Sequence, residues 1–95
     1  PWVQGRAEFA PRALGQRSIL ADPRPAANRD RVNQRIKQRE GFRPFAPAVG
    51  RDDADAWFEP LAADANTDFM NFVHVVRPEA RDRLGAVTHV DGTAR

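Results

Sequence analysis

The chain has 95 residues, of which 41% are hydrophobic and 29% are charged, and it has no cysteine. This length suffices for one small domain, and the lack of cysteine excludes a disulfide framework and a thiolate metal site. The net charge of +2 hides an asymmetry, because residues 1–50 carry ten Lys or Arg against four Asp or Glu, whereas residues 51–95 carry five against nine. We therefore expect anions to bind the first half.

No stretch of the sequence is apolar enough to span a bilayer, and no charged-then-apolar leader is visible. These features predict a cytoplasmic protein with no membrane partner. The chain also begins without Met. We expect it to be a piece of a longer protein.

Local patterns predict eight elements. In chain order they are a strand over residues 2–9, a short helix over 11–14, a strand over 18–21, a helix over 26–39, a strand over 45–49, a helix over 51–58, a strand over 69–76 and one or two helical turns over 78–84. Asp22 or a nearby residue is expected to cap the helix at 26–39, and Val32 and Ile36 to form its narrow buried stripe. Residues 61–68 are small and polar and predict a mobile loop.

Aromatic and apolar residues in the second half predict the core. Trp57 and Phe58 lie together at the end of an expected helix and are more typical of core packing than of base stacking. The run FMNFVHVV, residues 69–76, is apolar almost throughout and predicts a central strand. His74 within it is interpreted as a structural residue.

Arginines concentrate between Gly5 and Leu20. This segment holds Arg6, Arg12 and Arg17, and Glu8 is its only acid. Planar cations and backbone amides brought together by bends are typical of phosphate binding. A solvated basic loop is the alternative, and composition alone favours it.

Two later stretches also carry chemistry-bearing residues. Lys37 and Arg39 are two residues apart, so on an extended segment they would face one ligand together; Lys37 is otherwise a charge that favours a helix C-terminus. Near the end, His89 and Asp91 would share one strand face, as acid/base or metal-orienting pairs do. The alternative is a turn that the Asp91 side chain stabilises. For Asp91 this turn is favoured over a catalytic role, whereas for His89 a catalytic and a structural role both stay open.

Three runs, GRAEFAPRALGQRSILADPR, KQREGFRPFAPAV and THVDGTAR, occur in this order. Together they resemble the C-terminal domain of the O-carbamoyltransferases of antibiotic tailoring and nodulation-factor synthesis. The sequence departs from the family pattern at Ala7, Ala10, Gln16 and Gly41, where Met, Gly, Asn and Pro are usual. Ala10 matters most, since a backbone that needed positive φ there would tolerate Ala poorly.

The resemblance implies an α+β fold, with a small twisted mixed sheet and short flanking helices, similar to YrdC-like domains. Residues 1–95 are then a single partial domain of this kind, excised from a longer chain and inactive by itself. The resemblance further implies ATP, with Mg²⁺, and carbamoyl phosphate as ligands, and no metal site within these residues. The domain would form carbamoyl-adenylate, and an N-terminal sugar-kinase-like domain of the same parent chain would pass the carbamoyl group to an acceptor hydroxyl.

The resemblance also assigns residues to the site. They are Arg12, Arg17 and Ser18 for the phosphate or carbamoyl end, Lys37, Arg39 and Arg43 for the ATP phosphates, Thr88 for substrate, and His89 as a catalytic residue. Arg6 is expected instead to brace Glu8 or a neighbouring strand. No P-loop, dinucleotide fingerprint or nucleophile-elbow motif occurs, so ATP would be bound by scattered arginines and backbone.

Two other functions are consistent with the residues. The basic first half could serve a non-catalytic nucleic-acid-binding module, an alternative that the resemblance disfavours. The chain could also be a docking surface for a partner domain, exposing Trp2 or Phe69 as an apolar patch.

Overall fold

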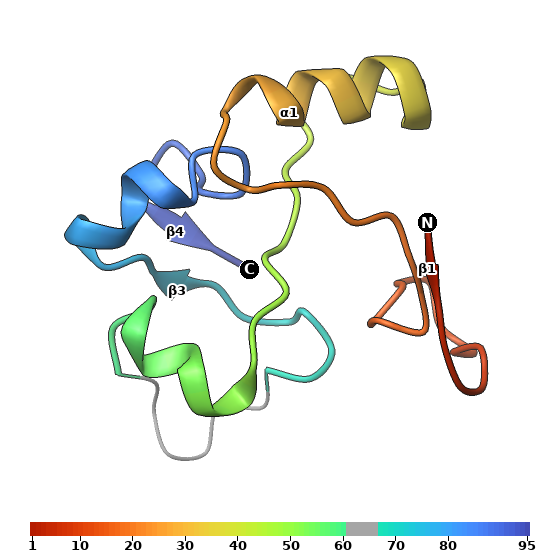
Figure 1. Cartoon of the computed structure of the whole chain (residues 1–95), viewed down its shortest axis with the longest axis horizontal. Coiled ribbons are helices and arrows are strands. Elements are labelled where there is room, and N and C mark those ends of the chain that lie inside the picture. Colours follow the sequence, from red (N-terminus) through yellow and green to blue (C-terminus); the bar gives the residue numbers. More distant parts are fainter. Residues whose placement is uncertain (61–66) are drawn as a thin grey trace.

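The computed structural model describes residues 1–60 and 67–95, and it shows two separate small sheets with short helices (Figure 1). Strand β1 (Trp2–Val3) pairs antiparallel with β2 (Arg17–Ser18), and β3 (His74–Val75) pairs antiparallel with β4 (Thr93–Ala94). The α+β class is confirmed. In place of one mixed sheet, the described residues form two antiparallel pairs.

Four helical segments accompany the sheets. Helix α1 (Ala27–Arg31) continues directly into the π-helix η1 (Val32–Lys37), while η2 (Arg51–Ala56) and η3 (Pro78–Arg83) are 3₁₀-helices. The helices expected over 26–39, 51–58 and 78–84 are therefore confirmed, with shorter boundaries. Pro78 lies in the first turn of η3, where its missing amide hydrogen costs no helical bond.

The core lies where η2, η3 and the β3–β4 sheet meet. It consists of Phe58, Val76, Ala80, Leu84, Val87 and Ala94, and Phe45 and Trp57 pack against it. The predicted roles of Trp57 and Phe58 in packing are thus confirmed. Phe58 and Val76 form a backbone bridge that joins the end of η2 to β3. The molecule measures only 18 Å along its shortest axis, which leaves room for this single small core.

The β1–β2 hairpin stands apart from this core, at the right of Figure 1. An extended segment, residues 43–50, runs between the helical pair α1–η1 and η2 (Figure 1). A cavity of about 750 Å³ lies beside this segment and is lined by apolar side chains that include Leu20, Val32 and Trp57. A hydrogen bond from the Ala86 amide to the Pro23 carbonyl ties the first half of the chain to the core.

Several expectations for the first half are wrong. Residues 11–14 form bends and no helix. The amides of Leu14 and Gln16 instead donate to the Glu8 carboxylate, which competes with helical hydrogen bonds. Asp22 does not cap α1, because its carboxylate accepts hydrogen bonds from the backbone amide and the guanidinium of Arg24. These bonds lower the Asp22 pKa to about 2, and the bond from the guanidinium has the largest effect.

Ile36 is also misplaced by the sequence pattern, because it is 55% exposed whereas Val32 is buried. The buried face of η1 consists of Val32 and the adjacent Asn33. Ala10, by contrast, does not adopt a positive φ, so alanine is compatible with the backbone there.

All four expected strands are present only in small part or absent: of residues 2–9 only Trp2–Val3 form a strand, and of residues 18–21 only Ser18 does. Residues 45–49 are extended but pair with no strand in the described part of the chain, and Pro44 and Pro47 cannot donate to a ladder. Of residues 69–76, only His74 and Val75 form a strand, and Phe69, Phe72 and Val73 are more than half exposed. The loop expected over 61–68 falls mainly on residues 61–66, outside the described residues. No helix in the described ranges is both long and apolar enough to cross a membrane.

Candidate anion-binding site

The charges of Arg12 and Arg39, from two separate segments, act on the guanidinium of Arg95. Arg12 follows the turns after β1, Arg39 follows η1, and Arg95 follows β4. Burial lowers the pKa of Arg95, and repulsion from Arg12 and from Arg39 lowers it further. Repulsion of this kind requires the Arg12 and Arg39 charges each to lie near that of Arg95. We call these three residues the arginine cluster.

No ion pair joins the arginine cluster to an acidic side chain of residues 1–60 and 67–95. The ion pairs seen there join Arg17 to Glu8, Arg24 to Asp22, Arg29 to Asp30, Arg43 to Glu40 and Arg51 to Asp68. The Nε atom of Arg95 is buried, and no described residue accepts its hydrogen bond. A buried, unpaired guanidinium donor costs free energy, and a bound anion would supply the acceptor.

Arg39 is held in place by Asn33, which is fully buried in η1. The Oδ1 atom of Asn33 accepts a 2.7 Å hydrogen bond from Arg39 Nε, and its Nδ2 group donates to the carbonyls of Gly41 and Arg43. The guanidinium also lies over the ring of Phe45, 4.8 Å from its centroid. These partners are neutral, so they restrict the orientation of Arg39 without forming an ion pair with it.

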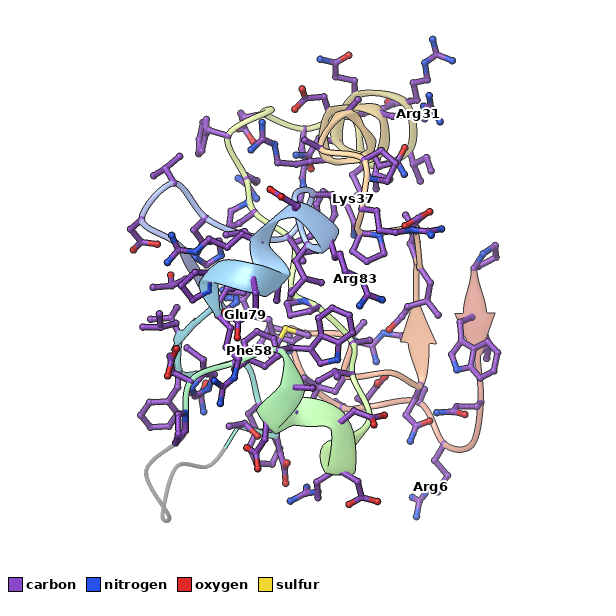
Figure 2. All side chains as sticks on the ribbon, turned by 60° about the vertical axis from the view of Figure 1, so that its left-hand side comes forward. Arg6, Arg31, Lys37, Phe58, Glu79 and Arg83 are labelled. Atoms are coloured by element: carbon purple, nitrogen blue, oxygen red, sulfur yellow. The ribbon has the colours of Figure 1, made fainter. Side chains whose placement is uncertain are left out.

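The loop that carries Arg12 is fixed by Glu8 and Arg17. Glu8 accepts from two backbone amides of the loop, and Arg17 donates to the Glu8 side chain and to the Ala10 carbonyl. Desolvation raises the Glu8 pKa, but the backbone hydrogen bonds and the Arg17 charge together bring it below its usual value. Arg17, and not Arg6, therefore braces Glu8, and Figure 2 shows Arg6 pointing away at the far end of the hairpin.

The other predicted site residues lie outside the arginine cluster, as far as the described contacts show. Lys37 is exposed at the end of η1 (Figure 2), and Arg43 forms a 2.8 Å ion pair with Glu40. Ser18 lies in β2 opposite Trp2. The Thr88 hydroxyl donates to the Leu84 carbonyl. Their roles in binding stay predictions.

The turn before β4 brings His89, Asp91 and Thr93 together, so the expectation that His89 and Asp91 share one strand face is wrong. The hydroxyl of Thr93 lies 2.7 Å from Asp91 Oδ1 and 3.0 Å from His89 Nδ1, and the Thr93 amide also donates to Asp91. The hydrogen bonds from Thr93 lower the pKa of Asp91, and the bond from the hydroxyl has the largest effect. The expected turn held by the Asp91 side chain is confirmed. The same carboxylate accepts from the Thr93 hydroxyl, which in turn contacts His89 Nδ1.

Sequence reasoning did not place Asn33, Thr93 or Arg95 in a site. The only available signals were an asparagine beside the buried Val32 and an arginine two residues after Thr93. Ala94 is 1% exposed and faces the core, so Thr93 and Arg95 project from the opposite side of the strand. No group of three or more His, Asp or Glu side chains in the described ranges is arranged to hold a metal ion.

Comparison with known proteins identifies the family. The family model described as carbamoyltransferase C-terminus matches residues 1–95. The chain belongs to the carbamoyltransferase C-terminal family.

Curated relatives of this family are much longer than the chain. It is 64% identical over 94 residues to the nodulation protein NolNO of Sinorhizobium fredii, which covers 99% of this chain and 14% of that protein. It is 48% identical over 94 residues to nodulation protein U of Azorhizobium caulinodans and 48% identical to the 3'-hydroxymethylcephem-O-carbamoyltransferase of Amycolatopsis lactamdurans, covering 99% of this chain and 16% and 17% of those proteins. The chain thus spans about one sixth of such relatives.

Proposed function

We propose that this domain is part of an O-carbamoyltransferase and binds ATP together with carbamoyl phosphate. The arginine cluster carries the proposal, because Arg95 is repelled by both Arg12 and Arg39, and a polyanion bound beside them would offset that repulsion. Membership of the carbamoyltransferase C-terminal family supports carbamoyl phosphate as one of the anions. The relative from Amycolatopsis lactamdurans is itself named as an O-carbamoyltransferase.

The proposed reaction joins the two ligands. Carbamoyl phosphate, ATP and one water give carbamoyl-adenylate, phosphate and pyrophosphate, and a second domain of the longer chain passes the carbamoyl group to an acceptor hydroxyl. Magnesium would enter with ATP, since Mg²⁺ is usually held by substrate phosphates and one or two carboxylates. Arg12, Arg39 and Arg95 would neutralise and align the phosphates, which is the main requirement of such a reaction.

The roles of the remaining predicted residues follow from this proposal. Arg17 acts by holding the loop of Arg12, and Lys37 and Arg43 supply further positive charge near the end of η1. In this proposal His89 faces the carbamoyl end of the ligand, and Thr88 and Ser18 donate to it through their hydroxyl groups. A YrdC-like topology for the complete domain belongs to the proposal as well.

Calorimetric titration of the full-length protein with ATP and with carbamoyl phosphate tests the proposal. We expect Arg12→Ala and Arg39→Ala each to weaken the binding of at least one ligand by about tenfold or more, the size of a lost charge-assisted hydrogen bond. Arg31→Ala is the matched control, because Arg31 is an exposed arginine on α1 (Figure 2). Unchanged binding of both ligands in both variants would contradict the proposal.

Binding of nucleic acid is the competing function. Exposed cations on α1 and η1, including Arg31, Arg35 and Lys37, could follow a phosphate backbone. Fluorescence anisotropy with labelled RNA and DNA at increasing salt separates the two. Tight binding that falls steeply with salt, without binding of carbamoyl phosphate, would favour this alternative.

A further inference from the structure

The hydrogen bonds around Thr93 determine which nitrogen of the His89 ring carries the proton. Asp91, whose pKa is lowered, is a carboxylate and can only accept, so the single hydroxyl proton of Thr93 points to Asp91 Oδ1 at 2.7 Å. The Thr93 oxygen can then only accept from the ring, and His89 Nδ1, at 3.0 Å, must be the donor. In the neutral ring the proton is therefore on Nδ1, and Nε2 has a free lone pair.

That lone pair has no partner in the described part of the protein. His89 Nε2 is buried, and no residue of 1–60 or 67–95 donates to it. A buried acceptor of this kind requires an N–H or O–H donor to offset its lost hydration. The backbone of His89 is fixed as well, because its amide donates to the Thr93 carbonyl at 2.7 Å.

The position of this acceptor relates it to the arginine cluster. Ala94 is buried in the core, so its neighbours Thr93 and Arg95 project from the other side of the strand. Thr93 holds the His89 ring, and Arg95 contributes a buried, unpaired guanidinium donor. This side of the strand thus offers a cation for a phosphate and, separately, an acceptor for a hydrogen-bond donor.

We propose that His89 Nε2 accepts a hydrogen bond from the amide N–H of the carbamoyl group, and that Thr93 and Asp91 are positioning residues that hold the proton of the neutral ring on Nδ1. The inference rests on the proposed function, since a carbamoyl phosphate joins an amide donor to a phosphate. Acyl phosphates that carry a methyl group in place of the amide leave Nε2 buried and unpaired. The histidine thereby selects the carbamoyl group against such acyl groups.

Two stable analogues test this selection without turnover. Phosphonoacetamide and 2-oxopropylphosphonate both carry a carbonyl and a phosphonate, and they differ only in an amino group in place of a methyl group. In full-length wild-type protein we expect calorimetry to show a preference of about tenfold or more for the amide, the size of one satisfied buried hydrogen bond. His89→Phe keeps a ring of similar shape without an acceptor, and we expect the preference to fall to about twofold or less.

A second pair of variants examines the positioning role. Thr93→Ser keeps the hydroxyl and should keep the preference, whereas Thr93→Val keeps the shape and should lose most of it. The ratio of the two affinities is the readout, because a merely structural change would weaken both analogues alike. Arg95→Met should weaken both equally, since it acts on the shared phosphonate.

The outcomes separate this inference from the function on which it rests. If neither analogue binds wild-type protein and carbamoyl phosphate does not bind either, the proposed function fails, and the selection fails with it. If both analogues bind equally well, a water or another protein group satisfies Nε2, and only the role of His89 is overturned. A preference that survives in His89→Phe overturns it as well.

Discussion

Asn33 and Arg39 are joined by a 2.7 Å hydrogen bond between a fully buried amide oxygen and a guanidinium Nε. The Arg39 amide also donates to the Asn33 carbonyl, so the helix end and the following turn are connected twice. Gln38 between them adopts a left-handed conformation with φ of 46°, which turns the chain back toward the helix. One buried side chain thus sets the direction of a cation in the arginine cluster.

Replacing Asn33 should therefore damage both stability and anion binding. Asn33→Ala leaves the carbonyls of Gly41 and Arg43 without their donor, and we expect a loss of about 1–3 kcal/mol in the free energy of unfolding. ATP affinity should fall because Arg39 loses its orientation. Chemical denaturation and calorimetry measure the two effects. The exposed neighbour Gln34 gives the control Gln34→Ala, and equal effects of the two variants would contradict this role.

The unpaired Arg95 predicts opposite effects with and without an anion. Arg95→Met removes a half-buried charge that Arg12 and Arg39 repel, so the ligand-free protein should be at least as stable as wild type. Pyrophosphate at a hundredfold excess over its dissociation constant should stabilise wild type by about 2.7 kcal/mol. It should stabilise Arg95→Met much less. Thermal unfolding with and without pyrophosphate measures this, and full stabilisation of the variant would refute the site.

Helices could be predicted from the sequence better than strands. The helices over 26–39, 51–58 and 78–84 depend on nearby residues, and all three are present. The run at residues 69–76 has the composition of a central strand, but a strand also needs a neighbour. Strand β4 offers only Thr93 and Ala94 as partners, so pairing in the described residues stops after two positions.

In the candidate site, too, residues placed by local sequence patterns could be predicted, and residues placed by contacts distant in sequence could not. The motif blocks pointed to Arg12, Arg39 and His89, which lie among bends and turns that short patterns describe. Arg95 could not be found that way, since its direction depends on Ala94 being buried by residues far away in sequence. Asn33 was missed because its partners are mainly backbone carbonyls, which leave no mark in a side-chain pattern.

Glu8 predicts a loss of stability in acid. Its pKa in the folded protein is below the usual 4.5, despite desolvation that acts in the opposite sense, so the folded state favours the ionised form. The resulting stabilisation is complete above the unfolded pKa and is lost as the pH falls from about 4.5 through the lower folded value. Glu8→Gln keeps an acceptor but removes the titration. Its melting temperature should fall less than that of wild type between pH 6 and pH 3, and an identical pH dependence would exclude Glu8 as a source.

Gly92 lies in the turn that carries Asp91 and Thr93, and its φ of +82° is a conformation that other residues adopt at a cost. A Cβ atom there would come within 2.9 Å of the Arg81 guanidinium. We expect Gly92→Ala to destabilise the protein by about 1 kcal/mol or more and to disturb the hydrogen bond between Thr93 and His89. Gly41→Ala is the matched control, because Gly41 lacks a positive φ and a Cβ atom added there would meet no heavy atom within 4 Å. Denaturant unfolding of both variants checks this, and a loss of stability at Gly41 equal to that at Gly92 would show that backbone conformation is not the cause.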